Sequence, residues 1–121
     1  MSGTYEDLTV WKKGMELVFE VYAATQHFPK DETYGLSSQM RRCAVSIPSN
    51  IAEGKGRTSD KELLVFLSHS RGSLYELNTQ ILIAQKLNYI HPAQCAELTS
   101  RTRELGRILN GYINAMRNPN R

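Results

Sequence analysis

The chain has few cysteines and no long apolar run, and both absences limit what it can be. Of its 121 residues only two are cysteines, and Cys43 and Cys95 do not form a Cys-x-x-Cys pair. Each lies on the apolar face of an expected helix, so we expect two buried thiols in a reducing cytoplasm. No apolar run reaches the ~20 residues that a membrane-spanning helix needs, and the opening MSGTYEDLTV has no signal-peptide pattern. We therefore expect a cytoplasmic protein with no membrane partner.

Patterns typical of enzymes and metal sites are also missing. None of His27, His69 and His91 has an acidic residue three positions earlier, as the Glu-x-x-His pairs of di-iron bundles require. Nothing resembles a zinc site, and GKGR at residues 54–57 lacks the spacing and the Ser/Thr of a P-loop. We predict no catalytic residue, no metal and no cofactor, and so a protein that is not an enzyme.

No segment alternates with the period of two that marks a β-strand, whereas four segments repeat apolar residues every three or four positions. These segments are residues 6–27, 36–53, 60–87 and 92–116. Ser59 and Glu62 match a helix-capping box, and Pro92 suits the first position of the last helix. Four amphipathic helices with short connections predict one all-α domain, residues 1–121, folded as an antiparallel up-down four-helix bundle.

The first helix carries more apolar surface than a single packing side uses. Two apolar strips run along it, one of Leu8, Trp11, Met15, Val18 and Tyr22 and the other of Val10, Leu17, Val21 and Phe28. Together they span an arc of about 200°, against little more than ~100° for an ordinary surface helix. We expect two buried sides, with a second copy of the chain covering one. The all-round apolar residues 81–83 predict that the third helix is enclosed there.

Pro48 stands inside the second helix, where it cannot donate a hydrogen bond to the Ala44 carbonyl and should bend the helix axis. Polar residues lie on one strip beside it, and the third helix offers others. We expect a hydrogen-bonded polar seam between these helices, formed by Arg42, Ser46, Asn50, Glu53, Ser70, Ser73 and Glu76. Arg42 would meet the carboxylate of Glu76 or Glu53 there. The alternative is that the strip simply faces solvent.

Basic residues gather on one side of the last helix, although the net charge of the chain is only +3. An arc of about 80° holds no acidic residue, and it carries Arg103, Arg107, Asn110, Asn114 and Arg117. Arg101 differs, because Glu97 and Glu104 are placed to pair with it. Arg41 on the second helix and Lys55 just after it, with Arg57 nearby in the loop, form a second candidate cluster.

Cations on one face bind phosphates by releasing counterions. The two clusters therefore predict binding to the backbone of RNA or DNA without base specificity. No aromatic residues alternate with the arginines, so base stacking has little support. The alternative function is a scaffold or protein–protein interaction module with no nucleic-acid ligand.

Two stretches carry a resemblance to a known family. FPKDETYGLSSQMRRCAVSIPSNIAEGKGR at residues 28–57 and FLSHSRGSLYELNTQILIAQKLNYI at residues 66–90 resemble signatures of small bacterial four-helix-bundle proteins. That family includes the 23S rRNA intervening-sequence proteins and is related to accessory proteins of diversity-generating retroelements. The resemblance implies an up-down bundle that assembles as a homopentamer and whose relatives work with nucleic acid, with no defined biochemical role for most members. In a ring, five modest basic patches would add through multivalency.

Overall fold

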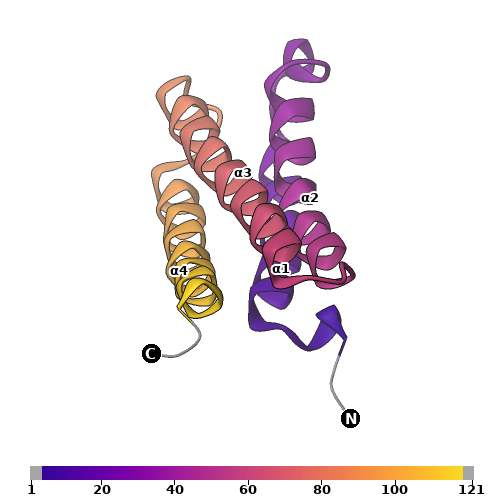
Figure 1. Ribbon diagram of the computed structural model, residues 1–121. Coiled ribbons are helices and arrows are strands. Elements are labelled where there is room, and N and C mark those ends of the chain that lie inside the picture. Colours follow the sequence, from indigo (N-terminus) through magenta and orange to yellow (C-terminus); the bar gives the residue numbers. More distant parts are fainter. Residues whose placement is uncertain (1–3, 119–121) are drawn as a thin grey trace.

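The computed structural model describes residues 4–118, which form helices and no strand. Four long helices follow one another, α1 (Thr9–Thr25), α2 (Leu36–Lys55), α3 (Asp60–Lys86) and α4 (Pro92–Arg117), as Figure 1 shows. Two short 3-10 turns, η1 (Tyr5–Asp7) and η2 (Lys30–Glu32), precede α1 and α2. The four predicted helices are confirmed. The main difference is that the predicted start of the first helix forms the separate turn η1.

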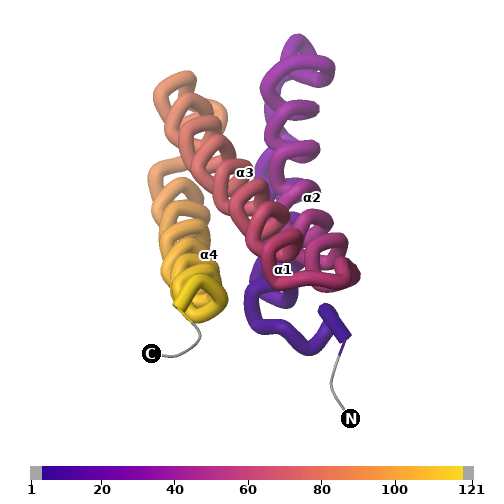
Figure 2. Tube along the Cα trace, viewed as in Figure 1, coloured from indigo at the N-terminus to yellow at the C-terminus, as the bar shows by residue number. Residues whose placement is uncertain are grey.

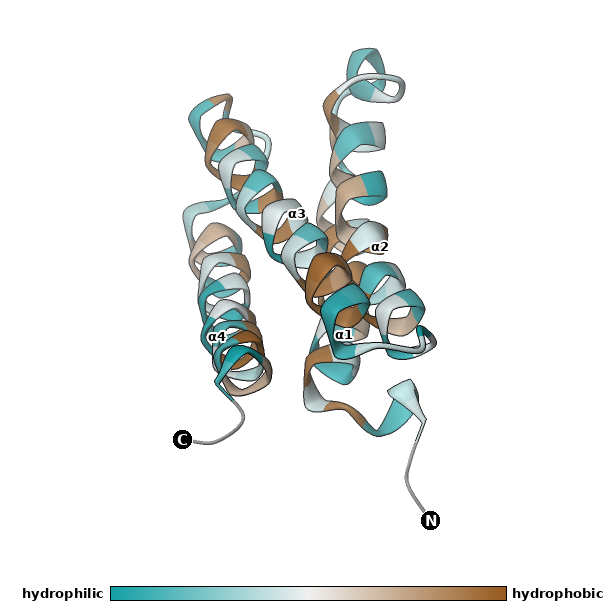
Figure 3. Ribbon diagram, viewed as in Figure 1, coloured by the Kyte–Doolittle hydropathy of each residue, from teal (hydrophilic) through white to brown (hydrophobic). Residues whose placement is uncertain are grey.

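The helices pack as a closed set of neighbours. α2 lies between α1 and α3, and α4 packs against both α3 and α1. Figure 2 shows the chain turning back at each connection, so that consecutive helices run side by side in opposite directions. In Figure 3 apolar and polar residues alternate along every helix, as expected for helices with one buried side. The all-α four-helix bundle that the sequence predicts is therefore the fold.

Local signals set where the helices begin. The Ser59 hydroxyl accepts a hydrogen bond from the Glu62 backbone N–H at 3.1 Å, and Pro92 occupies the first turn of α4. Before α2, Glu32 accepts the Leu36 backbone N–H at 3.0 Å and the Tyr89 hydroxyl at 2.9 Å. These two hydrogen bonds, that of Leu36 first, lower the pKa of the Glu32 carboxyl. Glu32 thus joins the start of α2 to the turn before α4.

The apolar arc of α1 is largely covered by its own chain. Val10, Leu17 and Val21 are buried, because α1 packs against both α2 and α4. The arc alone therefore does not require a second copy of the chain, contrary to our expectation. Phe19 is the large α1 side chain left most exposed, at 66%.

The end of α3 also differs from the sequence prediction. Ile81 is fully buried, but Leu82 and Ile83 are 48% and 46% exposed. The predicted enclosure of this stretch is therefore wrong for a single chain. The reason is that residues 81–83 point to successive sides of the helix, and α3 has neighbours on only some of those sides.

α2 continues as one helix through Pro48. α1 passes close to the proline ring at Gly14, where an added Cβ would lie 3.4 Å from Pro48 Cβ and Cδ. Within residues 4–118 no side chain donates a hydrogen bond to the Ala44 carbonyl that Pro48 leaves free. The expected bend of the axis at Pro48 stays a prediction. The sequence predicts that Gly54 and Gly56 end α2. The helix continues past Gly54 to Lys55, and Gly56 is its C-cap residue.

The contact between α2 and α3 is polar at two points and has no ion pair within the described part of the chain. The Ser70 hydroxyl donates to the Ile47 carbonyl at 3.0 Å, and the Cys43 thiol donates to the Ser73 carbonyl at 2.9 Å. The expected pair between Arg42 and a carboxylate does not form, because Arg42 is exposed to solvent. A hydrated guanidinium at the surface avoids the cost of desolvation that a buried pair carries.

The other members of the predicted seam bond locally. Ser46 Oγ donates to the Cys43 carbonyl at 2.6 Å, and Asn50 Nδ2 donates to the Ser46 carbonyl at 2.8 Å. Glu53 pairs with Arg57 at 2.8 Å, one helical turn later in the sequence. Glu76 accepts a hydrogen bond from Gln80 Nε2 at 3.4 Å on its own helix. Of the seven residues predicted for the seam, only the Ser70 side chain bonds across to α2.

We expect Ser70→Ala to lower the free energy of unfolding by about 1 kcal/mol, since it removes a buried hydrogen bond between helices. Arg42→Ala, the matched control, should change it by no more than about 0.5 kcal/mol because Arg42 is exposed. Urea denaturation of both variants measures the difference. A larger loss for Arg42→Ala than for Ser70→Ala would restore the ion-paired seam.

Candidate functional site

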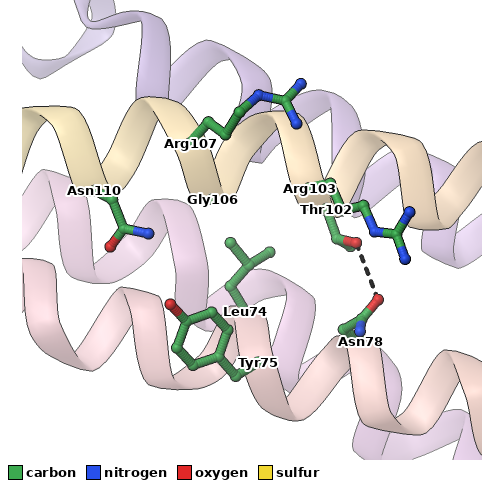
Figure 4. A pocket seen from close by; sticks show the side chains of 8 residues that line it. All are labelled: Leu74, Tyr75, Asn78, Thr102, Arg103, Gly106, Arg107 and Asn110. Carbon is green, nitrogen blue, oxygen red and sulfur yellow. Dashed lines mark hydrogen bonds between the residues drawn. The ribbon is translucent and has the colours of Figure 1, made fainter.

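A groove between α3 and α4 is the main hollow on the described surface that combines apolar walls with unpaired cations. Its first part encloses about 270 Å³ and is lined by Leu74, Tyr75, Asn78, Thr102, Arg103, Gly106, Arg107 and Asn110. Figure 4 shows Leu74 between the helices, Tyr75 at the α3 edge and the two arginines on α4. A second hollow of about 410 Å³ adjoins it and shares Arg103 and Arg107. We call the two together the α3–α4 groove.

The arginines of this groove have no counter-charge. Arg103 and Arg107 are exposed, and within residues 4–118 neither takes part in an ion pair. No Asp or Glu is among the residues that line either hollow. A third guanidinium, that of Arg71 on α3, donates to Asn110 Oδ1 at 3.1 Å at one end of the first hollow. The groove therefore concentrates positive charge beside an apolar floor.

On the opposite side of α4 the charged side chains form ion pairs. Arg101 lies 3.5 Å from Glu16, 4.0 Å from Glu20 and 3.4 Å from Glu97. Arg101 is thus paired, as expected, but Glu104 pairs with Lys13 of α1 at 3.5 Å in place of Arg101. Each charged side chain in these pairs thus has a partner of opposite sign, with four carboxylates for two cations. The arginines between α3 and α4 have no such partner.

Sequence reasoning found Arg103 and Arg107 but missed the residues that α3 brings to them. Arg71, Tyr75 and Asn78 lie about one turn apart along α3, and that spacing is the signal that could have found them. Tyr75 also places an aromatic ring on the α3 wall of the hollow whose α4 wall carries the arginines, which the sequence of α4 alone did not predict. The base-stacking chemistry that the sequence left without support is thus available at this site.

The remaining predicted basic residues do not join the groove. Arg117 lies in the last turn of α4, ten residues beyond Arg107 and outside both hollows. Arg41 and Lys55 do not form a cluster, since fourteen residues of helix put them about 21 Å apart. Lys55 is exposed at the end of α2.

Arg41 and Arg57 are both occupied by contacts within the protein. Arg41 Nε donates to Thr25 Oγ1 at 2.7 Å, and its guanidinium lies 4.6 Å from the centroid of the Tyr22 ring. Its partners are in the last turns of α1, where a cation suits the helix dipole. Arg57 pairs with Glu53 and lies 4.8 Å from the centroid of the Phe66 ring. Arg41 is thus not the exposed cation that we expected.

The two cysteines are buried and free. Burial, and after it the nearby Glu76 carboxylate, raise the pKa of the Cys43 thiol to about 12. A thiol of that pKa is protonated at neutral pH and is a poor nucleophile. Across residues 4–118, no three His, Cys, Asp or Glu side chains gather as metal ligands would. In the same residues no helix has the length and apolar character to span a bilayer.

These features define a class: an all-helical four-helix-bundle protein with an unpaired basic groove along its third and fourth helices. Comparison with known proteins then places the chain more closely. The model of the 23S rRNA-intervening sequence protein family matches residues 6–111. The chain belongs to this family. No match is found among curated proteins.

A solved structure has the same fold. It is the crystal structure of a protein of unknown function from the S23 ribosomal protein family, from Bacteroides thetaiotaomicron. The two chains align with a TM-score of 0.80 and 19% sequence identity, over 87% of this chain and 95% of the other. At that identity the likeness shows the fold alone. The family resemblance drawn from residues 28–57 and 66–90 is confirmed by the family match.

Proposed function

We propose that the protein binds the sugar–phosphate backbone of nucleic acid through the α3–α4 groove and that it is not an enzyme. One observation carries this proposal: Arg103 and Arg107 share one groove that has no carboxylate in its lining. Unpaired guanidinium groups release counterions from a phosphate chain on binding, and they form paired hydrogen bonds to phosphate oxygens. The proposal does not separate RNA from DNA, because both carry the same phosphate backbone, so both are ligands to test.

Self-association would strengthen a patch of this size. The resemblance stated above implies a homopentamer, and several large apolar side chains near the end of α3 are half exposed, namely Leu82, Ile83 and Leu87. Copies that share one nucleic-acid strand bind with a combined affinity beyond that of each patch. A sedimentation measurement of mass tests this part of the proposal. A particle of five times 13.7 kDa supports the pentamer, and a particle of 13.7 kDa contradicts any self-association.

A salt titration tests the groove itself. We expect the affinity for short RNA and DNA oligonucleotides to fall steeply as salt rises. The double variant Arg103→Ala with Arg107→Ala should flatten the slope of log K against log salt by about 1.4–1.8, which corresponds to two lost phosphate contacts. Fluorescence anisotropy between ~50 and ~200 mM salt measures this slope.

The matched control removes the same charge elsewhere. Lys12→Ala with Lys61→Ala takes two exposed cations away from α1 and the start of α3, so its slope should stay close to that of the unaltered protein. A second comparison, Lys55→Ala with Arg57→Ala, tests the basic end of α2, where we expect a smaller effect because Arg57 is already paired. Equal effects of all three double variants would contradict a defined site in the groove.

A protein–protein interaction module is the second candidate function. The exposed apolar side chains of α3, among them Leu82 and Ile83, favour it, because large apolar groups at a surface commonly mark interfaces. Absence of any nucleic-acid binding at ~50 mM salt would remove the first proposal and leave this one. A pull-down from native lysate with Leu82→Glu as the control variant then tests the module directly.

A further inference from the structure

We infer that the first hollow of the α3–α4 groove holds one unstacked base of a single-stranded nucleic acid, stacked on Tyr75, while the flanking phosphates meet Arg103 and Arg107. This inference rests on the proposed function and narrows its ligand to single strands. The observations that carry it concern the ring of Tyr75, the floor of the hollow and the hydrogen-bonding groups at its edge.

Tyr75 is a large aromatic residue that is only partly covered by its own chain. Its side chain is 55% exposed. The aromatic pairs among residues 4–118 are Tyr5–Trp11, Phe28–Tyr89 and Phe66–His69, and the arginine–ring contacts involve Tyr22 and Phe66. Within the described chain the Tyr75 ring thus has neither an aromatic partner nor an arginine over it, and it lines the hollow.

The floor of the hollow suits a flat ring. Leu74 is buried beneath it, and Gly106 adds no side chain on the α4 side. A Cβ at Gly106 would stand 3.6 Å from Leu74 Cδ2, in ordinary van der Waals contact, and a long side chain there would extend into the space between the two helices. Its volume of about 270 Å³ lies below the ~300–1,000 Å³ of pockets for drug-sized ligands. A single base with its sugar outside matches this size better than a larger ligand does.

The polar groups at the edge are mainly donors. Arg71 donates to Asn110 Oδ1 at 3.1 Å, which leaves the Asn110 amide NH2 as the group that Asn110 can offer. The Thr102 hydroxyl lies 3.1 Å from Asn78 Oδ1, as the dashed line in Figure 4 shows, and it also lies 2.9 Å from the Thr99 carbonyl. Arg103 and Arg107 add only N–H donors. Base edges with carbonyl and ring-nitrogen acceptors complement such a rim, and a carboxylate that would repel phosphate is absent from it.

Stacking on Tyr75 selects for single strands, because a base in a duplex has both faces covered by its neighbours. Proteins read splayed bases of single strands by placing them on aromatic side chains. Substitution of such an aromatic side chain lowers the affinity for the nucleic acid about five- to a hundredfold. The arginines alone would bind duplex and single strand through phosphates only.

The experiment compares four fluorescent probes of equal length: an oligothymidylate, the corresponding oligouridylate, an abasic strand with the same phosphates, and a blunt DNA duplex. The unaltered protein should bind the two base-carrying single strands about five- to a hundredfold more tightly than the abasic strand. Tyr75→Leu should remove that difference, and Tyr75→Phe should retain it. Similar affinities for oligothymidylate and oligouridylate mean that the base is held without reading the 2′-hydroxyl.

Two further variants keep the result interpretable. Tyr34→Leu removes a tyrosine that is more exposed than Tyr75, at 96%, and that does not line the groove, and it should change nothing. Gly106→Leu fills the hollow while leaving Tyr75 in place and should abolish the preference for base-carrying strands. Far-UV circular dichroism verifies that each variant is folded.

The outcomes separate this inference from the function on which it rests. If no probe binds at ~50 mM salt, the proposed function fails. If the abasic strand binds as tightly as the oligothymidylate and Tyr75→Leu has no effect, backbone binding stands and the base pocket is disproved. A duplex bound more tightly than the single strands would also overturn the inference.

Discussion

Leu77→Ala is expected to lower the free energy of unfolding by about 2–5 kcal/mol. Leu77 is fully buried on α3, the helix that packs against both α2 and α4. Shortening its isobutyl side chain to a methyl group loses the transfer free energy of the removed carbons. It also leaves a cavity that the surrounding helices fill only in part. Urea denaturation followed by circular dichroism at a fixed protein concentration measures the change, because self-association would make the stability depend on concentration.

Leu82→Ala is the matched control on the same helix. Leu82 is 48% exposed in the single chain, so its truncation should change the free energy of unfolding by less than about 1 kcal/mol. A cost equal to that of Leu77→Ala would mean that Leu82 is covered in solution. Since the described chain leaves it uncovered, another copy would then have to supply the cover.

Gly54→Ala is expected to destabilise the protein by about 1–2 kcal/mol, although alanine normally favours a helix. A Cβ at this position would stand 2.7 Å from Phe66 Cβ and 3.1 Å from Leu63 Cδ1. Phe66 Cβ is fixed to the backbone of α3, so α2 and α3 would have to move apart. Thermal unfolding monitored at 222 nm measures the loss as a lower Tm.

The control for Gly54 is another helical glycine in open space. No atom lies within 4 Å of a Cβ added at Gly72, so Gly72→Ala should stabilise the protein by about 0.5–1 kcal/mol through helix propensity alone. Opposite signs for the two substitutions are the expected result. A stabilising Gly54→Ala would show that α2 and α3 approach less closely at this point than the structure has them.

Most of the fold could be predicted because each helix must bury one side, and burial of one side leaves a repeat of three and four in the sequence. The starts of α3 and α4 could be predicted as well, since Ser59 and Pro92 act on the residues next to them. The sequence did not indicate which helix, or which chain, covers a given apolar side. Periodicity indicated how much of α1 is apolar, but only the packing of α4 against α1 shows that the same chain covers it.

The candidate site could be predicted on one helix and not across two. Arg103 and Arg107 share a side of α4 that the sequence alone identifies. Tyr75 joins them only because of the way α3 is rotated against α4, and that rotation depends on the packing of the whole core. The prediction that Arg41 is an exposed cation was wrong for the same reason. Its direction round α2 was known, but its partner Thr25, at the end of α1, was not.

The ion pairs between α1 and α4 make the protein electrically lopsided. That side holds the carboxylates of Glu16, Glu20, Glu97 and Glu104 against two cations, Lys13 and Arg101, whereas the groove on the other side of α4 carries three guanidinium groups and no acid. A molecule with such a charge separation experiences a torque in the field of a polyanion and turns before contact. We therefore expect a polyanion to be attracted to the groove and repelled by the acidic side.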